Sequence, residues 1–131
     1  MGKVHVASFI YTHCAGICPA MVTQLSKVQK VLDGRDALLQ VWVEEGNLDK
    51  TDYAMQSLKN SIRWDEQRFG LELDLDRFMI VAVSDFNMGA MENKGLNIFN
   101  NKYVLASAAT ATDADFLGVE SVIAHEYFHN W

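Results

Sequence analysis

Two histidines and a glutamate near the end of the chain have the types and spacing of a metal-dependent hydrolase. The segment reads His125-Glu126-Tyr127-Phe128-His129. Residues four apart lie about one turn apart on a helix, so both imidazoles face the same side and can bind one ion. Glu126 lies about 100° round the helix, where its carboxylate can hold a water molecule beside the ion and take its proton. This spacing predicts a zinc hydrolase, with His125 and His129 as ligands and Glu126 as general base.

Two cysteines near the start of the chain are the second group that could do chemistry. Cys14 and Cys18 are the only cysteines in the sequence. A single pair this close in sequence does not make the disulfide framework of a secreted domain. Metal binding, thiol redox chemistry and plain burial remain as explanations for them.

The elements around the cysteines predict a strand, a loop and a helix. Val4–Thr12 is a mostly apolar, β-rich run, which is typical of a buried strand. Pro19 suits the first turn of a helix, and Gly34 suits its end. Between them, apolar residues recur at helical spacing, namely Met21, Val22, Leu25, Val28 and Leu32.

The middle of the chain predicts a second strand and a second helix. A short apolar run over residues 37–43 predicts a strand. Asp49 or Thr51 can cap the helix that follows, and Gly70 ends it. Trp64 in this helix is interpreted as a packing residue. The apolar face of the helix consists of Ala54, Met55, Leu58, Ile62 and Phe69.

The last part of the chain predicts two further strands before the helix that carries the histidines. Leu71–Asp76 alternates strictly between leucines and a solvated acidic face, and it leads into an apolar strand that ends at Val83. A strand-like stretch covers Gly95–Leu105. Thr112 or Asp113 opens the last helix, which is expected to run to the end of the chain. Its apolar side consists of Phe116, Val119, Val122, Ile123 and Phe128.

Composition narrows the class of protein. Half of the 131 residues are apolar and 21% are charged, which is typical of a globular chain long enough to bury a core. The net charge of −6, without a basic run, argues against nucleic acid as a partner. No apolar stretch is long enough for a membrane span, and the start lacks the features of a signal peptide. We expect a cytoplasmic location, while the oligomeric state stays open.

A second motif lies about thirty residues before the histidine helix. The pentapeptide Gly89-Ala90-Met91-Glu92-Asn93, followed by His-Glu-x-x-His, resembles the signature pair of the zinc aminopeptidases of the aminopeptidase N family. The likeness covers residues 37–131 and resembles the bacterial members. It is carried further by Gly46-Asn47-Leu48-Asp49, by Trp64-Asp65-Glu66-Gln67-Arg68-Phe69-Gly70 and by Lys94-Gly95-Leu96-Asn97-Ile98-Phe99-Asn100.

The resemblance implies a thermolysin-like catalytic domain that removes N-terminal amino acids from peptides. It implies that His125 and His129 bind zinc and that Glu126 is the general base. In the family, a third zinc ligand is a glutamate on the next helix, and a tyrosine that acts on the transition state comes later. This sequence ends at Trp131, so we expect an incomplete site with weak zinc binding and little or no activity. Glu120 lies on another side of the helix and cannot replace the third ligand.

The resemblance also assigns roles to the pentapeptide. Glu92 would bind the free α-ammonium group of the substrate. This contact favours peptides with a charged N-terminus, because an internal peptide bond would leave the carboxylate without a partner. Gly89 and Ala90 are small enough for the substrate backbone to approach as an added strand. Met91 would form a soft wall beside the first side chain, and Asn93 completes the substrate-binding segment.

The cysteine segment resembles a different family. Residues 8–21, which contain Cys14, Cys18 and Pro19, are similar to the Cys-x-x-x-Cys-Pro segment of the SCO/SenC copper chaperones. The likeness covers residues 4–33. It implies a thioredoxin-like strand-to-helix turn at which two thiolates bind copper. The distal histidine ligand of that family has no counterpart here, so we expect at most an incomplete copper or redox site.

Together these observations predict an α+β chain with two parts. Residues 1–35 would form a thioredoxin-like strand-loop-helix fragment, and residues 36–131 a partial thermolysin-like catalytic domain. The leading hypothesis is a zinc-dependent aminopeptidase fragment that acts on peptides with a free N-terminus. The alternatives are a copper-binding or thiol-redox module, and a fusion or truncated product with no activity of its own.

Overall fold

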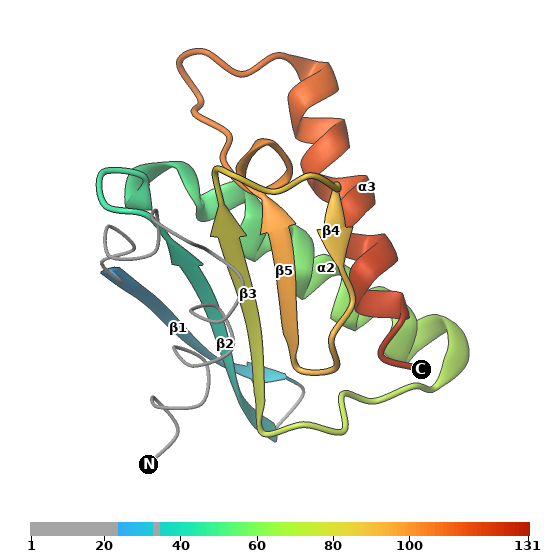
Figure 1. Cartoon of the computed structure of the whole chain (residues 1–131). Helices are drawn as coiled ribbons and strands as arrows, with labels where there is room; N and C mark the ends of the chain where they lie inside the picture. Colours follow the sequence, from blue (N-terminus) through green and yellow to red (C-terminus); the bar gives the residue numbers. More distant parts are fainter. Residues whose placement is uncertain (1–23, 33–34) are drawn as a thin grey trace.

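The computed structural model describes residues 24–32 and 35–131 of the chain (Figure 1). These residues form five strands, two α-helices and two short 3₁₀ segments. The bounds are β1 Gln24–Leu32, β2 Arg35–Val43, η2 Leu48–Lys50, α2 Asp52–Phe69, β3 Arg77–Val83, β4 Ala90–Met91, β5 Leu96–Asn100, η3 Asn101–Tyr103 and α3 Asp113–Phe128.

The strands form one mixed sheet in the order β1-β2-β3-β5-β4. The three central strands β2, β3 and β5 are parallel, whereas β1 and β4 at the two edges are antiparallel to their neighbours. α2 connects β2 to β3 and is the crossover that two adjacent parallel strands require. The described residues therefore form a mixed α/β fold.

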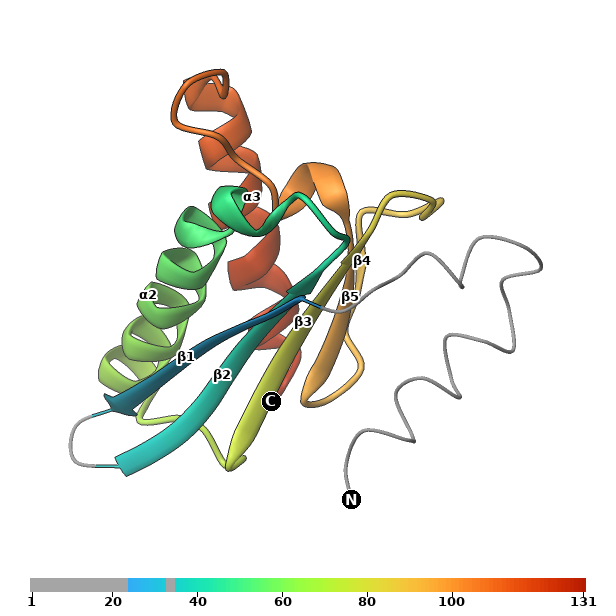
Figure 2. The same ribbon diagram turned by 90° about the vertical axis from the view of Figure 1, so that its left-hand side faces the viewer.

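Both helices cover the same face of the sheet, as Figure 2 shows. Leu39 pairs with Phe78 and Ile80 pairs with Asn97, so alternate residues of neighbouring strands point to this face together. Burial of these side chains against α2 and α3 removes them from water and stabilises the fold. The largest apolar side chains of this core are Leu39, Val41, Leu58, Ile62, Phe78, Ile80, Phe99, Val104, Val119, Ile123 and Tyr127.

The predicted strand before α2 and both predicted helices in this part of the chain are confirmed. Gly70 ends α2 with a φ of 68°, a left-handed conformation that favours glycine. Thr112 begins α3 through a reciprocal capping box with Asp115. Thr51 occupies the N-cap position of α2, but its hydroxyl donates to the carbonyl of Leu48 at 2.7 Å and does not cap the helix.

The helix predicted from Pro19 to Gly34 is wrong over Gln24–Leu32, where the chain forms β1. This strand pairs with β2 along its whole length, from Gln24 opposite Val43 to Leu32 opposite Arg35. The pairing satisfies backbone groups along an edge of β2 that would otherwise lack partners. The backbone hydrogen bonds with β2 stabilise a strand here, although the apolar residues recur at helical spacing.

Other predictions for the first part of the chain lie outside the described residues. These are the strand over Val4–Thr12 and the loop that carries Cys14 and Cys18, so the thioredoxin-like unit stays a prediction there. Within residues 24–32 and 35–131, neither α-helix combines the length and the apolar character needed to cross a membrane.

Two predicted strands are shorter than expected. Leu71–Asp76 is irregular, and β3 begins only at Arg77. Leu73 is nevertheless buried, because this segment lies over the core without pairing as a strand. The stretch predicted over Gly95–Leu105 is a strand only as far as Asn100, whose side chain then accepts a hydrogen bond from the backbone of Lys102 and starts a 3₁₀ turn.

Two aromatic residues were assigned to the wrong environment. Phe128 is 48% exposed, whereas its neighbour Tyr127 is completely buried. Trp64, interpreted as a packing residue, is 58% exposed and contacts Phe69 edge-on with ring centroids 5.3 Å apart.

α3 ends at Phe128, before the end of the chain. The side of this helix that is buried consists of Val119, Ile123, Glu126 and Tyr127.

A pair of glycine substitutions tests how the helices are built. Gly70→Ala should lower the free energy of unfolding by about 1 kcal/mol, because alanine is strained at a positive φ. Gly118→Ala should raise it by up to about 1 kcal/mol, because alanine favours the helix interior. Its new methyl group would meet the Tyr103 ring at an ordinary distance of 3.8 Å. Urea denaturation of both variants measures the difference, and changes of the same sign would contradict the helix assignments.

Candidate active site

The packing of α3 on the sheet places Glu126 at the edge of the core. Tyr127 packs against Phe78 of β3, with ring centroids 5.4 Å apart in a T-shaped arrangement. Ile123 is also buried, so one stripe of the helix is directed toward the sheet. Glu126 lies on the same stripe and is only 7% exposed. One of its carboxylate oxygens, Oε2, is buried without a hydrogen-bond partner.

The two histidines lie beside this stripe, where solvent reaches them. The Nε2 atoms of His125 and His129 are 3.1 Å apart. Two nitrogens that share one tetrahedral zinc ion lie about 3.3 Å apart, since each Zn–N bond is about 2.0–2.1 Å long. The separation is close to that value, and it is also the distance of a hydrogen bond between the two rings.

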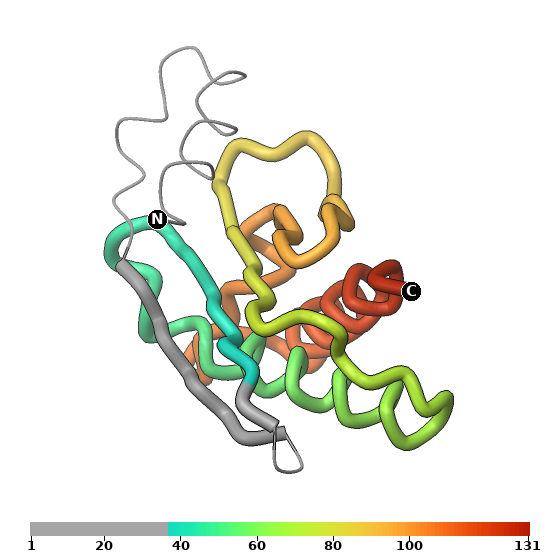
Figure 3. Tube along the Cα trace, turned by 90° about the horizontal axis from the view of Figure 1, so that it is seen from below, coloured from blue at the N-terminus to red at the C-terminus, as the bar shows by residue number. Residues whose placement is uncertain are grey.

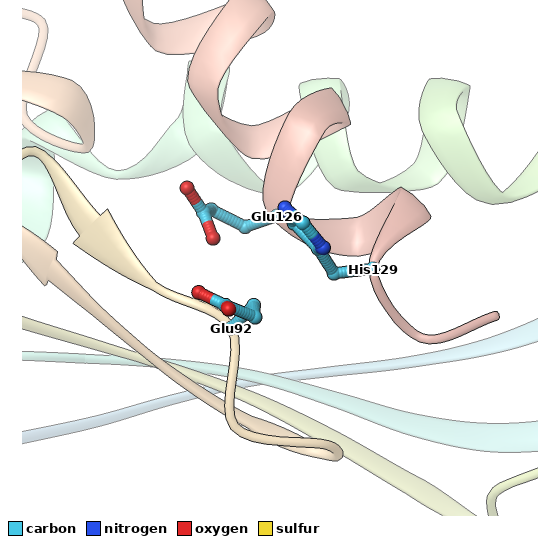
Figure 4. A group of neighbouring side chains, drawn as sticks. All are labelled: Glu92, Glu126 and His129. Atoms are coloured by element: carbon cyan, nitrogen blue, oxygen red, sulfur yellow. The ribbon is translucent and has the colours of Figure 1, made fainter.

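The pentapeptide lies at the edge of the sheet that faces α3. Ala90 and Met91 form β4, and Ala90 is buried on the helix-covered face. Glu92 follows directly and points toward α3, as Figure 4 shows. Ligand atoms of Glu92, Glu126 and His129 all lie within 4.8 Å of one another, although 34 residues separate the two glutamates. Two carboxylates and an imidazole thus converge from two elements.

Gly89 and the ring of Tyr103 set the spacing between β4 and α3. A Cβ atom at Gly89 would lie 3.2 Å from the Tyr103 ring, which is closer than side chains normally approach. The other side of the region is lined by α3, where Gly118 lies next to the same ring. Tyr103 therefore packs between two glycines, and a larger residue at Gly89 would push it away.

Asn93 turns the chain from the pentapeptide into β5. Its backbone carbonyl accepts a hydrogen bond from the backbone N–H of Leu96 at 2.9 Å.

The electrostatics of the cluster centre on Glu126. Burial raises the pKa of Glu126 above its usual value. His125 and His129 act in the opposite direction and favour the charged carboxylate, while Glu92 adds to the rise. A raised pKa moves a carboxylate toward the range in which a general base works best near neutral pH.

A hydrogen-bonded link, which sequence reasoning missed, joins the two segments of the site. Asp74 accepts a hydrogen bond from Lys94 at 2.7 Å and another from Asn130 at 3.0 Å. Lys94 follows the pentapeptide and Asn130 follows His129. Asp74 was interpreted as part of a solvated acidic face, and only its position opposite two distant segments reveals the link.

The structure brings most of the predicted site residues together. Gly89, Ala90, Met91, Glu92 and Asn93 lie on β4 and its turn, opposite the helix that carries the histidines and Glu126. Met91 is exposed beside the site. Glu120 lies away from it, where one of its oxygens accepts a hydrogen bond from Tyr53 at 3.2 Å. Cys14 and Cys18 lie outside the described residues, so their relation to the site stays a prediction.

Two parts of the chain resemble two known families. The model of the peptidase family M1 domain matches residues 53–131, which is more than half of the chain. The chain therefore belongs to peptidase family M1. The SCO1/SenC family model matches residues 1–43, so the first third of the chain is similar to that family.

Individual relatives extend this result. The chain is 68% identical to aminopeptidase N of Escherichia coli over 98 residues, and 65% identical to aminopeptidase N of Haemophilus influenzae over the same length. Each match covers 75% of this chain and 11% of the relative. A crystal structure of Legionella pneumophila aminopeptidase A in complex with aspartic acid matches with a TM-score of 0.78 and 37% identity, over 83% of this chain and 13% of that chain. The chain thus spans about a tenth of the length of the curated relatives it matches.

The Asp74 link generates a prediction about pH. The hydrogen bonds from Lys94 and Asn130 hold the pKa of Asp74 below its usual value. The ionised side chain of Asp74 therefore stabilises the fold fully above the pKa of an unfolded aspartate, about 3.9. This stabilisation is lost as the pH falls through the pKa that Asp74 has in the folded chain. We expect Asp74→Ala to lower the free energy of unfolding more at pH 7 than at pH 3. Urea denaturation at both values measures this.

Asp76→Ala is the matched control for that experiment. Asp76 is exposed two residues away, and its carboxylate has no hydrogen bond among the described residues. It should change stability little at either pH. Equal effects of the two substitutions would show that Asp74 does not link the segments.

Proposed function

We propose that the chain carries the core of a zinc-dependent aminopeptidase site, which removes the N-terminal amino acid from peptides. The observation that carries this proposal is the convergence of Glu92, Glu126 and His129 within 4.8 Å. Membership of peptidase family M1 and the similarity to aminopeptidase N of Escherichia coli support it. The same findings support a thermolysin-like catalytic domain in the second part of the chain. The division into residues 1–35 and 36–131 stays a prediction, and β1 joins the same sheet as β2.

His125 and His129 would hold the zinc ion. Their Nε2 atoms converge, and imidazole suits this metal. Bound there, zinc would supply a Lewis acid that polarises the scissile carbonyl. Of the described residues near the ion, Glu126 and Glu92 have other proposed roles, so the two imidazoles are the assigned zinc ligands. Because two ligands bind zinc weakly, we expect zinc affinity and turnover to be low for this chain on its own.

Glu126 would act as the general base. Its carboxylate takes a proton from the water molecule that attacks the carbonyl carbon and passes it to the leaving amine, so the peptide bond breaks without free charge on the nitrogen. The unpartnered Oε2 and the raised pKa suit this role.

Glu92 would select peptides with a free N-terminus. A carboxylate at the end of β4 can pair with an α-ammonium group, whereas an acylated terminus or an internal peptide bond leaves it without a partner. The outer edge of β4 is unpaired among the described strands, so the substrate backbone can add to it as a further strand. Gly89 and Ala90 leave room for that approach, and Met91 borders the first side chain.

Hydrolysis of L-alanine 4-nitroanilide by the zinc-loaded chain tests this function. Glu126→Gln should lower kcat about a hundredfold or more while zinc binding persists, because only proton transfer is lost. Glu92→Gln should mainly raise KM, because it removes the partner of the α-ammonium group. His129→Ala should weaken zinc binding, measured by competition with a chromophoric chelator.

Two controls make the experiment decisive. Glu45→Gln, on an exposed loop residue away from the site, should change none of these values. N-acetyl-L-alanine 4-nitroanilide should not be cleaved, because it lacks the ammonium group. Zinc binding that survives His129→Ala, or hydrolysis that survives Glu126→Gln, would refute the assignment.

We infer a second candidate function for the first part of the chain, which is copper or thiol chemistry at Cys14 and Cys18. The match of the SCO1/SenC family model to residues 1–43 favours it. Two thiolates suit copper(I), a soft ion. The chain should bind copper(I) in competition with bicinchoninate, and Cys14→Ser and Cys18→Ser should each abolish that binding while His125→Ala leaves it intact. Copper binding that persists without both thiols would rule this out.

A further inference from the structure

A hollow of about 470 Å³ lies between α2 and α3, away from the proposed catalytic residues. Figure 3 shows the two helices side by side, with the molecule seen from below the view of Figure 1. α2 contributes Trp64 and Asp65, and Phe69 lies at its end, while α3 contributes Glu120, Ala124 and Phe128. The spacing of the α3 residues is four, so they form one stripe of that helix. The stripe differs from the one that carries the histidines.

Three aromatic rings form one wall of this hollow. Trp64 and Phe69 have ring centroids 5.3 Å apart, and Phe69 and Phe128 have centroids 5.7 Å apart. All three side chains are about half exposed, at 58%, 50% and 48%. A continuous exposed aromatic surface of this kind is typical of a binding site, because scattered apolar residues do not cluster in this way.

Asp65 is a buried carboxyl group among the residues that line the hollow. It is only 3% exposed, and its Oδ2 atom is buried without a hydrogen-bond partner. Burial raises the pKa of Asp65, and no described cationic side chain offsets that rise. A buried carboxylate without a partner costs free energy in the isolated chain. Because Asp65 lines the hollow, a donor bound there would offset part of this cost.

We propose that the hollow between α2 and α3 is a docking site for an arginine side chain of a partner polypeptide. The guanidinium group would donate to Asp65 and lie against the rings of Trp64, Phe69 and Phe128. Arginine fits better than lysine, because its planar group stacks on aromatic rings while it donates a hydrogen bond to a carboxylate. Glu120 at the rim and the net charge of −6 also favour a cation.

A capped peptide tests the site independently of the proposed aminopeptidase activity. Acetyl-Leu-Arg-Leu-amide has no free N-terminus for Glu92 to bind. Titrated into the ¹⁵N-labelled full chain, it should shift the NMR signals of Asn60, Trp64 and Phe128 in a saturable way. Acetyl-Leu-citrulline-Leu-amide has the same shape without the charge. It should bind about tenfold more weakly or worse, because charge-assisted hydrogen bonds carry a difference of this size.

Variants then assign the binding to these residues. Asp65→Asn should reduce affinity for the arginine peptide to that of the citrulline peptide. Trp64→Ala should also weaken binding, and it should leave the fold intact because the side chain is largely exposed. Equal affinity for the two peptides, no shifts at millimolar peptide, or full affinity of Asp65→Asn would each overturn the proposal.

The stability of Asp65→Asn provides a second, independent test. Because burial raises the folded pKa of Asp65, its contribution to stability is greatest below the unfolded value, about 3.9, and is lost as the pH rises through the folded value. The variant should therefore be more stable than the unsubstituted chain at pH 7 and should lose this advantage near pH 3. A variant less stable than the unsubstituted chain at pH 7 would show that the carboxylate serves the fold itself, and would overturn the docking role.

Discussion

The rotation of α3 about its own axis, set by burial of Tyr127, is the constraint on which the rest of the site depends. Tyr127 and Ile123 pack completely into the core, and Tyr127 contacts Phe78. Once these two side chains point inward, the helix period leaves no freedom for the others. Glu126 must lie at the core edge, and His125 and His129 must lie together on one flank. Stability and chemistry therefore depend on the same packing contact.

The sheet carries the other half of the site to this helix. Strand order places β4 at an edge, next to β5 and in front of α3. Tyr103 sets the separation by packing between Gly89 and Gly118. Asp74 links the segment after β4 to the end of α3, because it accepts hydrogen bonds from Lys94 and Asn130. The packing of Tyr103 and the hydrogen bonds of Asp74 thus bring Glu92 close to Glu126, although neither glutamate takes part in these contacts.

Two carboxylates in this fold are buried without hydrogen-bond partners for one oxygen each, Glu126 and Asp65. Burial raises the pKa of both. Groups of this kind cost stability in the free chain, and ionisable groups with shifted pKa values are more frequent at functional sites than elsewhere. They lie on two sides of the α2–α3 layer, one toward β4 and one toward the hollow. Each of the two proposed interactions would supply a partner for one of these carboxylates.

The sequence by itself predicted β2, β3, β5 and both helices, although two of the strands are shorter than predicted, and it named the candidate site residues. Local patterns predict α2 and α3, because caps and helical spacing act within a few residues, and the two motifs identify the histidines and glutamates without any fold. Tertiary structure decided what local patterns cannot. Residues 24–32 form β1 because the edge of β2 offers a backbone ladder, despite apolar residues at helical spacing. Asp74, read from sequence as a solvated acid, links two segments because the fold places Lys94 and Asn130 beside it. Burial and pairing between distant segments depend on the whole chain, so these features could be found only in three dimensions.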